Sequence, residues 1–175
     1  MAYMDDLICP HNMKTAASLT NELALAICWE EGQFRNGSQF SVGTALGFGQ
    51  TEPAELQRLI SAGAISIDMA KVRSFDDHEA IEAMLQMLDY YIGRFPNSRR
   101  QALKAYAGYD FKKTQAWHDN RNKIMDDWEA CEAALMAINN YQVDGDLTMK
   151  ALAKARPFNP EQVISGLRYR DWLNL

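Results

Sequence analysis

The sequence predicts one predominantly helical domain, on three observations. Its 175 residues are enough for a single domain with one sizeable core. Hydrophobic residues make up 47% and charged residues 23%, the balance of a globular protein. Apolar residues recur at three- and four-residue steps through most of the chain, and no repeat or low-complexity tract interrupts them. We therefore expect residues 1–175 to fold as one unit.

The first helix is predicted from Ala16 to Glu31, because Leu19, Leu23 and Ile27 share one face at helical spacing. Gly32 follows it and suits the left-handed conformation common after a helix C-terminus. Residues 32–50 are rich in Gly, Ser, Asn and Gln. They predict a loop, with at most a short β-hairpin near residues 35–50.

Capping and turn residues delimit three further helices. The predicted starts are Thr51–Pro53, Ser74–Asp77 and Ser98–Gln101, and the predicted ends are Gly63, Phe95 and Gly108. A long helix is then predicted from about Thr114 to Asn140, and a last one opens at Asn159–Pro160. We expect the helices of residues 113–175 to pack on the part that spans about residues 15–112.

Two adjacent carboxylates, Glu30 and Glu31, lie at the C-terminal end of the first predicted helix. The helix dipole is negative there, and Trp29 and Phe34 could desolvate a neighbouring side chain. Both effects disfavour the ionised form of a carboxyl group, which is the condition for a general acid near neutral pH. Alternatively, the two residues are solvated acids at a helix end.

Three short motifs occur in a fixed order: Ile27-Cys28-Trp29-Glu30-Glu31, then Ser41 to Gln50, then Ala105-Tyr106-Ala107-Gly108. Together they resemble the soluble lytic transglycosylase and goose-type lysozyme superfamily over roughly residues 19–110. Members carry an apolar helix ending in a catalytic Glu. A Ser-x-x-Gly-Ala-x-Gly-Leu-Met-Gln-like loop and an Ala-Tyr-Asn-Ala-Gly-like segment follow. The resemblance implies a lysozyme-like fold.

Aligned on the family pattern, Glu31 takes the place of the catalytic acid. The resemblance implies that the substrate-binding residues are Ser41, Gly47, Phe48, Gln50 and Tyr106. It also implies a substrate, peptidoglycan, and a reaction, cleavage of the β-1,4 bond between N-acetylmuramic acid (MurNAc) and N-acetylglucosamine (GlcNAc). The chain departs from the pattern in three places: Gly32 replaces the Ser that usually follows the acid, Phe48-Gly49 replaces Leu-Met, and the Asn after the tyrosine is missing. These departures motivate an alternative, a non-catalytic wall-binding or virion structural protein of the same fold.

The spacing of acidic residues bears on mechanism. Glycosidases normally use two carboxylates, yet no Asp or Glu lies between Gly32 and Thr51. This favours a single acid, Glu31, acting first as proton donor and then as base. In the lytic transglycosylases that the chain resembles, the sugar's own 6-hydroxyl attacks and leaves a 1,6-anhydro end. Glu52 or Asp110 could instead activate water after folding, which would make a hydrolytic muramidase.

Other site classes lack the residues they need. Net charge is −5, so we expect no nucleic-acid partner. The three His and three Cys residues have no metal-ligand spacing, so we expect no metal and no cofactor. Cys28 and Cys131 lie on apolar helical faces, which predicts buried free thiols.

We expect no membrane insertion, because no apolar stretch approaches the length of a transmembrane helix. The acidic segment Met1–Asp6 lacks an apolar run and predicts no secretory signal. A wall-cutting enzyme of this kind would act in the periplasm or cell wall after delivery by a phage or a secretion system.

Overall fold

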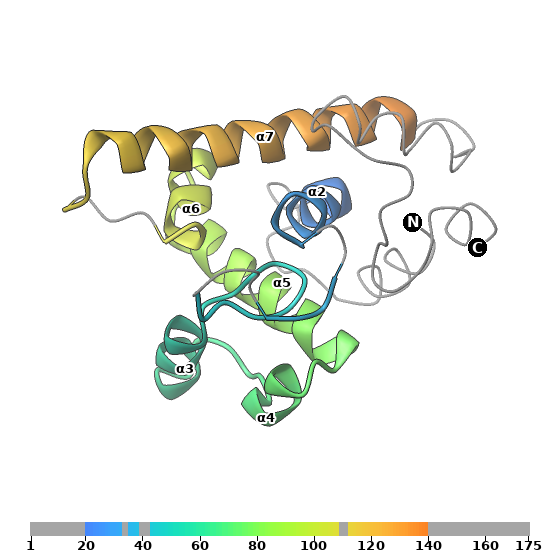
Figure 1. The fold of residues 1–175 in the computed structure, drawn as a ribbon, viewed down its shortest axis with the longest axis vertical. Coiled ribbons are helices and arrows are strands. Elements are labelled where there is room, and N and C mark those ends of the chain that lie inside the picture. Colours follow the sequence, from blue (N-terminus) through green and yellow to red (C-terminus); the bar gives the residue numbers. More distant parts are fainter. Residues whose placement is uncertain (1–19, 33–34, 39–42, 109–111, 140–175) are drawn as a thin grey trace.

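The computed structural model describes residues 20–32, 35–38, 43–108 and 112–139. This part of the chain is mostly helical, which confirms the predicted class (Figure 1). Its helices are α2 (Asn21–Gly32), α3 (Pro53–Ser61), α4 (Met69–Arg73), α5 (Asp77–Arg94), α6 (Arg99–Tyr106) and α7 (Gln115–Asn139). The predicted hairpin is represented by two isolated antiparallel bridges, Ser38 with Leu46 and Leu46 with Thr51. Ser41, Cys9, Asp110 and the helix predicted at Asn159 lie outside the described residues.

Helix α2 lies at the centre of the core, packed against the long helix α7, while α5 packs against α6 (Figure 1). Every side chain from Leu23 to Trp29 is at most 3% exposed. This burial extends beyond the single apolar face that the spacing predicts, because a helix that is apolar all round is enclosed on all sides. Glu30 and Glu31, at the end of this helix, are by contrast only partly buried.

A buried carboxylate on α7 holds the starts of two other helices. The Glu132 carboxylate accepts a hydrogen bond from the Thr20 hydroxyl, Oγ1 to Oε1 at 2.5 Å, and forms an ion pair with Arg99. Thr20 Oγ1 in turn accepts from the backbone N–H of Leu23 at 3.0 Å, so it caps α2. Since Glu132 is only 4% exposed, these bonds satisfy a charge that would otherwise be costly to bury. They tie the first turns of α2 and α6 to α7.

Local signals located the helix starts to within a few residues. The cap predicted at Ser98 is confirmed: its side chain accepts from the backbone N–H of Gln101. Helix α5, however, is capped by Asp76, not Ser74, and α3 begins after Glu52, not Thr51. The Thr51 hydroxyl instead donates to the Leu46 carbonyl at 3.2 Å.

The helix ends show one wrong prediction. Gly63 and Gly108 adopt the positive φ angles expected after a helix, +66° and +68°. Gly32 does not; it lies within α2, and a Cβ there would come 3.3 Å from the Phe48 carbonyl oxygen. Gly32 therefore allows the loop backbone to approach α2 closely, rather than reversing the chain.

The thiols of Cys28 and Cys131 are buried and free, as predicted. Burial raises the pKa of Cys28 and raises the pKa of Cys131 to about 12, with the charges of Glu30 and Glu132 adding to the latter. No helix in the described ranges has the length and apolarity needed to cross a bilayer.

Candidate functional site

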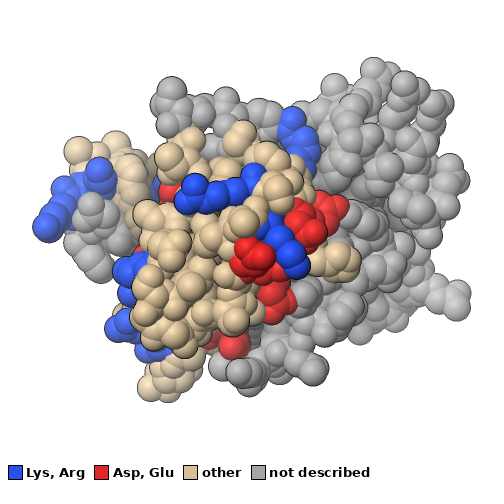
Figure 2. Space-filling view, turned by 90° about the horizontal axis from the view of Figure 1, so that it is seen from below, with Lys and Arg blue, Asp and Glu red and all other residues tan. Residues whose placement is uncertain are grey.

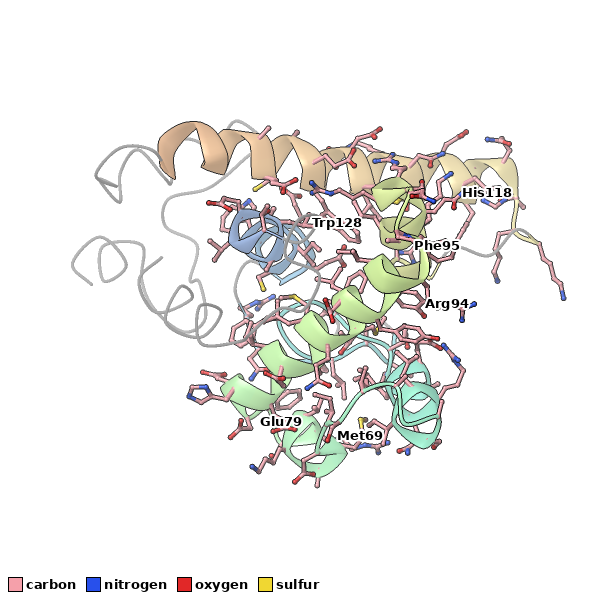
Figure 3. All side chains as sticks on the ribbon, turned by 180° about the vertical axis from the view of Figure 1, so that it is seen from behind. Met69, Glu79, Arg94, Phe95, His118 and Trp128 are labelled. Atoms are coloured by element: carbon pink, nitrogen blue, oxygen red, sulfur yellow. The ribbon has the colours of Figure 1, made fainter. Side chains whose placement is uncertain are left out.

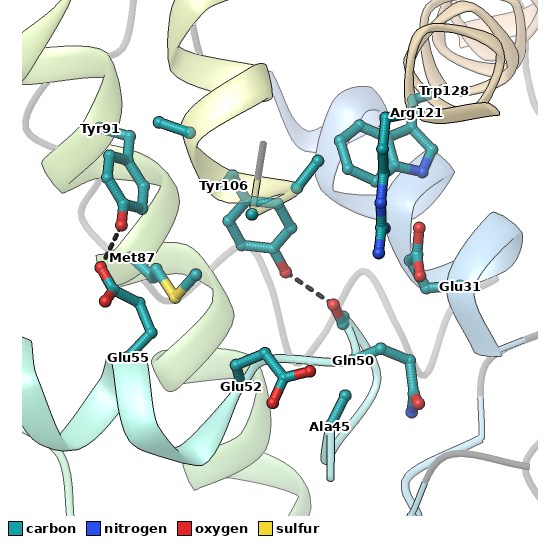
Figure 4. Close-up of a pocket in the computed structure, with 14 residues that line it drawn as sticks. Glu31, Ala45, Gln50, Glu52, Glu55, Met87, Tyr91, Tyr106, Arg121 and Trp128 are labelled. Carbon is teal, nitrogen blue, oxygen red and sulfur yellow. Dashed lines mark hydrogen bonds between the residues drawn. The ribbon is translucent and has the colours of Figure 1, made fainter. Parts of the chain in front are cut away.

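A pocket of about 370 Å³ lies at the C-terminal end of α2 (Figure 4). It is lined by residues from α2, the following loop, α3, α5, α6 and α7: Glu31, Ala45, Gly49, Gln50, Glu52, Glu55, Met87, Tyr91, Ala105, Tyr106, Ala107, Gly108, Arg121 and Trp128. Four residues singled out from the sequence therefore meet at one pocket, although the first and the last lie 75 positions apart: Glu31, Gln50, Glu52 and Tyr106. This size suits a small-molecule or sugar ligand.

The two acids at the end of α2 have different surroundings. The charge of Glu30 contributes to the raised pKa of Cys131 on α7, whereas the charge of Glu31 contributes to the raised pKa of Tyr106. Only Glu31 lines the pocket, and its side chain is partly buried. Consecutive residues of a helix point about 100° apart, so the end of α2 offers one acid to the pocket and turns the other towards α7.

Tyr106 connects α6 to the loop beside Glu31. Its ring is 7% exposed and meets Trp128 edge to face, with centroids 5.9 Å apart. Its hydroxyl donates to the Gly49 carbonyl oxygen at 2.8 Å. Burial, followed by the charges of Glu31 and Cys28, raises the pKa of Tyr106 well above its usual value. The phenol is therefore a neutral donor that holds the loop at the pocket wall.

Gly49 is the point of closest approach between the loop and the core. A Cβ added there would lie 2.5 Å from the Tyr106 hydroxyl and 2.6 Å from the side chain of Met84, both of which are buried. No larger residue fits without moving them, which explains why glycine stands here.

We expect Gly49→Ala to destabilise the fold by about 1–3 kcal/mol, the usual cost of forcing extra volume into a packed core. Chemical denaturation measures this. The matched control is Gly93→Ala on α5, where an added Cβ meets no atom within 4 Å. If Gly49→Ala were no less stable than Gly93→Ala, the close contact between loop and Tyr106 would be refuted.

The loop is held by its own polar groups. Gly47 has a φ of +78°, and Gln50 has the positive φ of +46° that side chains rarely adopt. The Gln50 amide nitrogen Nε2 donates to the carbonyl oxygens of Gly47 at 2.8 Å and Gly37 at 3.3 Å. These bonds hold the strained turn and leave Oε1 of Gln50 to accept from a ligand.

Two of the predicted substrate-binding residues do not line the pocket. Phe48 is 1% exposed and belongs to the core, so its prediction as a substrate contact is corrected: the apolar ring packs inward where the loop crosses α2. Gly47 shapes the turn, with the side chain of Ala80 only 3.2 Å from the position of its missing Cβ. Ser41 lies outside the described residues.

Further carboxylates lie along the wall beyond the loop. Glu52 is exposed, accepts from the Thr44 hydroxyl at 2.6 Å and lines the pocket, as a second carboxylate would. Glu55, which the sequence did not single out, accepts from the Tyr91 hydroxyl. The hydrogen bond from Arg58, more than that from Tyr91, lowers the pKa of Glu55, so this carboxyl stays ionised and cannot serve as the acid.

Helix α7 contributes Arg121 and Trp128, which sequence analysis missed as site residues. Trp128 lies below α7 on the side of the core (Figure 3), and Arg121 extends into the pocket beside it (Figure 4). The two are seven residues apart, two helical turns on one face. This spacing along the predicted long helix was the signal in the sequence that could have placed the two residues together.

The described surface carries charges of both signs. Figure 2 shows both acidic and basic side chains on one face. One ion pair of the described residues joins Glu55 and Arg58, with 2.6 Å between Oε1 and Nη2. Within the described ranges no three His, Cys, Asp or Glu side chains are grouped to hold a metal ion.

Comparisons of this chain with protein-family models, with curated proteins and with solved structures found no match.

Proposed function

We propose that this chain is a peptidoglycan-cleaving glycosidase of lysozyme-like fold that cuts the MurNAc-β-1,4-GlcNAc bond. The observation that carries the proposal is the convergence of Glu31, Gln50 and Tyr106 on one pocket. These residues come from the three motifs that resemble the lytic transglycosylases. Tyr106 and the loop are joined through the Gly49 carbonyl, so the pocket wall beside Glu31 is a defined surface.

The proposed reaction needs one protein carboxyl group. Glu31, protonated, donates its proton to the glycosidic oxygen, and the bond from that oxygen to C1 of MurNAc breaks. The MurNAc 6-hydroxyl then attacks C1 and gives its proton to the Glu31 carboxylate. A 1,6-anhydro end forms and the acid is regenerated, so no water is consumed. Gln50 Oε1 would orient the sugar, and Tyr106 would keep the loop in place.

The test is incubation of the protein with purified cell-wall sacculi, followed by mass spectrometry of the soluble fragments. We expect the turbidity of the sacculi to fall and the fragments to carry anhydro ends, lighter by one water than hydrolysed ends. Binding to sacculi without release of any fragment would contradict the proposal. That result would support a non-catalytic wall-binding protein. This alternative is suggested by the absence of Ser after Glu31 and of Asn after Tyr106.

A second candidate is a hydrolytic muramidase, because Glu52 lines the same pocket as Glu31. The two mechanisms differ in what Glu52→Gln does. If the sugar's own hydroxyl attacks, no second carboxylate is needed, and we expect fragment release by Glu52→Gln to stay within about threefold of the parent. A loss of about 100-fold or more, with hydrolysed ends from the parent, would instead identify Glu52 as the base. Glu79→Gln on α5, outside the pocket, is the control.

A further inference from the structure

Among the described residues that line the pocket, Arg121 is the only Lys or Arg, against the carboxylates of Glu31, Glu52 and Glu55. Its guanidinium carbon lies 5.2 Å from the centre of the Trp117 ring, which supports the side chain from one side. Figure 4 shows the guanidinium extending from α7 into the pocket, towards the Gly49–Gln50 loop. The positive charge therefore faces the same pocket as these carboxylates, and Figure 4 shows it beside Glu31.

The other arginines between α6 and α7 have acidic partners. Arg99 pairs with Glu132, and Arg100 pairs with Asp126 at 2.6 Å and Glu129 at 2.8 Å. Among the described residues Arg121 forms no such ion pair, and its buried Nε, like that of Arg99, meets no hydrogen-bond acceptor there. The same holds for Nε1 of Trp128, a residue only 1% exposed.

Two buried donors without acceptors are costly for the free protein, and both residues that carry them line a pocket with space for a ligand. A guanidinium and an indole N–H are donors only, so the ligand group they fit is an acceptor. Arginine favours carboxylates and phosphates, since its planar guanidinium matches two of their oxygens, and of these groups the proposed glycan substrate carries carboxylates. The ligand group that fits these donors is thus an anion.

We propose that Arg121, assisted by Trp128 Nε1, binds a carboxylate of the muramoyl unit and so selects acidic glycans over neutral ones. This assignment rests on the proposed function, and it adds which group of the substrate Arg121 recognises. The carboxylate has two sources: the free lactyl acid of a strand without peptide, or an acid on an attached peptide stem. Chitin oligosaccharides have neither and serve as the neutral ligand.

The test measures binding in the Glu31→Gln background, where the ligand is not consumed. The ligands are a peptide-free MurNAc–GlcNAc tetrasaccharide, the same tetrasaccharide with peptide stems, and a GlcNAc tetrasaccharide. We expect Arg121→Gln to weaken binding of at least one acidic ligand about 10- to 100-fold and to leave GlcNAc binding unchanged. The acidic ligand that loses affinity identifies the source of the carboxylate. Arg73→Gln on α4 is the control, and thermal melting verifies that each variant is folded.

Equal losses for acidic and neutral ligands, or no loss for any, would overturn the assignment, because Arg121 would then be structural or uninvolved. Arg121→Lys provides a second variant, which keeps the positive charge but lacks the planar guanidinium. We expect it to retain part of the preference for acidic ligands. A failure of the proposed function would give a different result from a failure of the Arg121 assignment. If the Glu31→Gln parent binds none of the three ligands, the glycan pocket itself is wrong, and the assignment falls with it.

Discussion

Glu31→Gln is expected to abolish the clearing of cell-wall sacculi while leaving the fold intact. An amide has the size of the carboxyl group but cannot donate the proton that the glycosidic oxygen requires. General-acid catalysis contributes about 10²- to 10⁴-fold, so we expect the rate to fall by at least about 100-fold. The side chain is partly buried at the end of α2, and the substitution removes no packing volume. Turbidity loss measures the rate, and circular dichroism with thermal melting verifies the fold.

The matched control is Glu30→Gln, the same substitution one position earlier on α2. Because Glu30 is not among the residues that line the pocket, clearing should stay within about threefold of the parent protein. Full activity in Glu31→Gln would remove Glu31 from the role of acid. A larger loss in Glu30→Gln than in Glu31→Gln would place the acid one residue earlier.

Trp128→Ala is expected to have the largest effect on stability. The side chain is 1% exposed and meets the ring of Tyr106 between α7 and α6. Truncating a buried tryptophan leaves a cavity and typically costs about 3–5 kcal/mol of unfolding free energy. Since Nε1 of Trp128 has no acceptor in the described part of the chain, the loss comes from packing. Urea denaturation measures it.

Trp117→Ala, on the same helix, provides the comparison for Trp128→Ala. Trp117 is partly exposed, so we expect a cost of no more than about 1–2 kcal/mol. If the two substitutions cost the same, α7 would not pack on the core through Trp128 as described. The pocket would then lose the wall that Trp128 and Tyr106 form together.

Helix positions were predictable where the signal is local. The side chain of Ser98 bonds the backbone of Gln101 three residues on, and α7 begins at Gln115, one residue from the predicted start. Helix α4 was missed because it has five residues, too few for apolar periodicity to show. Its cap, Asp68, accepts from the backbone N–H of Ala70 and was the one local signal available.

The site was predictable only in part, because much of it depends on contacts between distant segments. The order of three motifs was sufficient to select Glu31, Gln50 and Tyr106, which line one pocket. No local pattern shows that Phe48 turns into the core, or that Gly49 meets the hydroxyl of Tyr106. These depend on how closely the loop approaches α2, α5 and α6, which only the folded chain specifies.

The proposal that this pocket is a glycan site is tested most directly by a crystal structure of Glu31→Gln with a bound MurNAc–GlcNAc tetrasaccharide. We predict sugar density in the pocket beside Gln50 and Tyr106. The glycosidic oxygen should lie about 3 Å from the substituted side chain at position 31. A tetrasaccharide bound elsewhere on the surface, with this pocket empty at saturating ligand, would contradict the account.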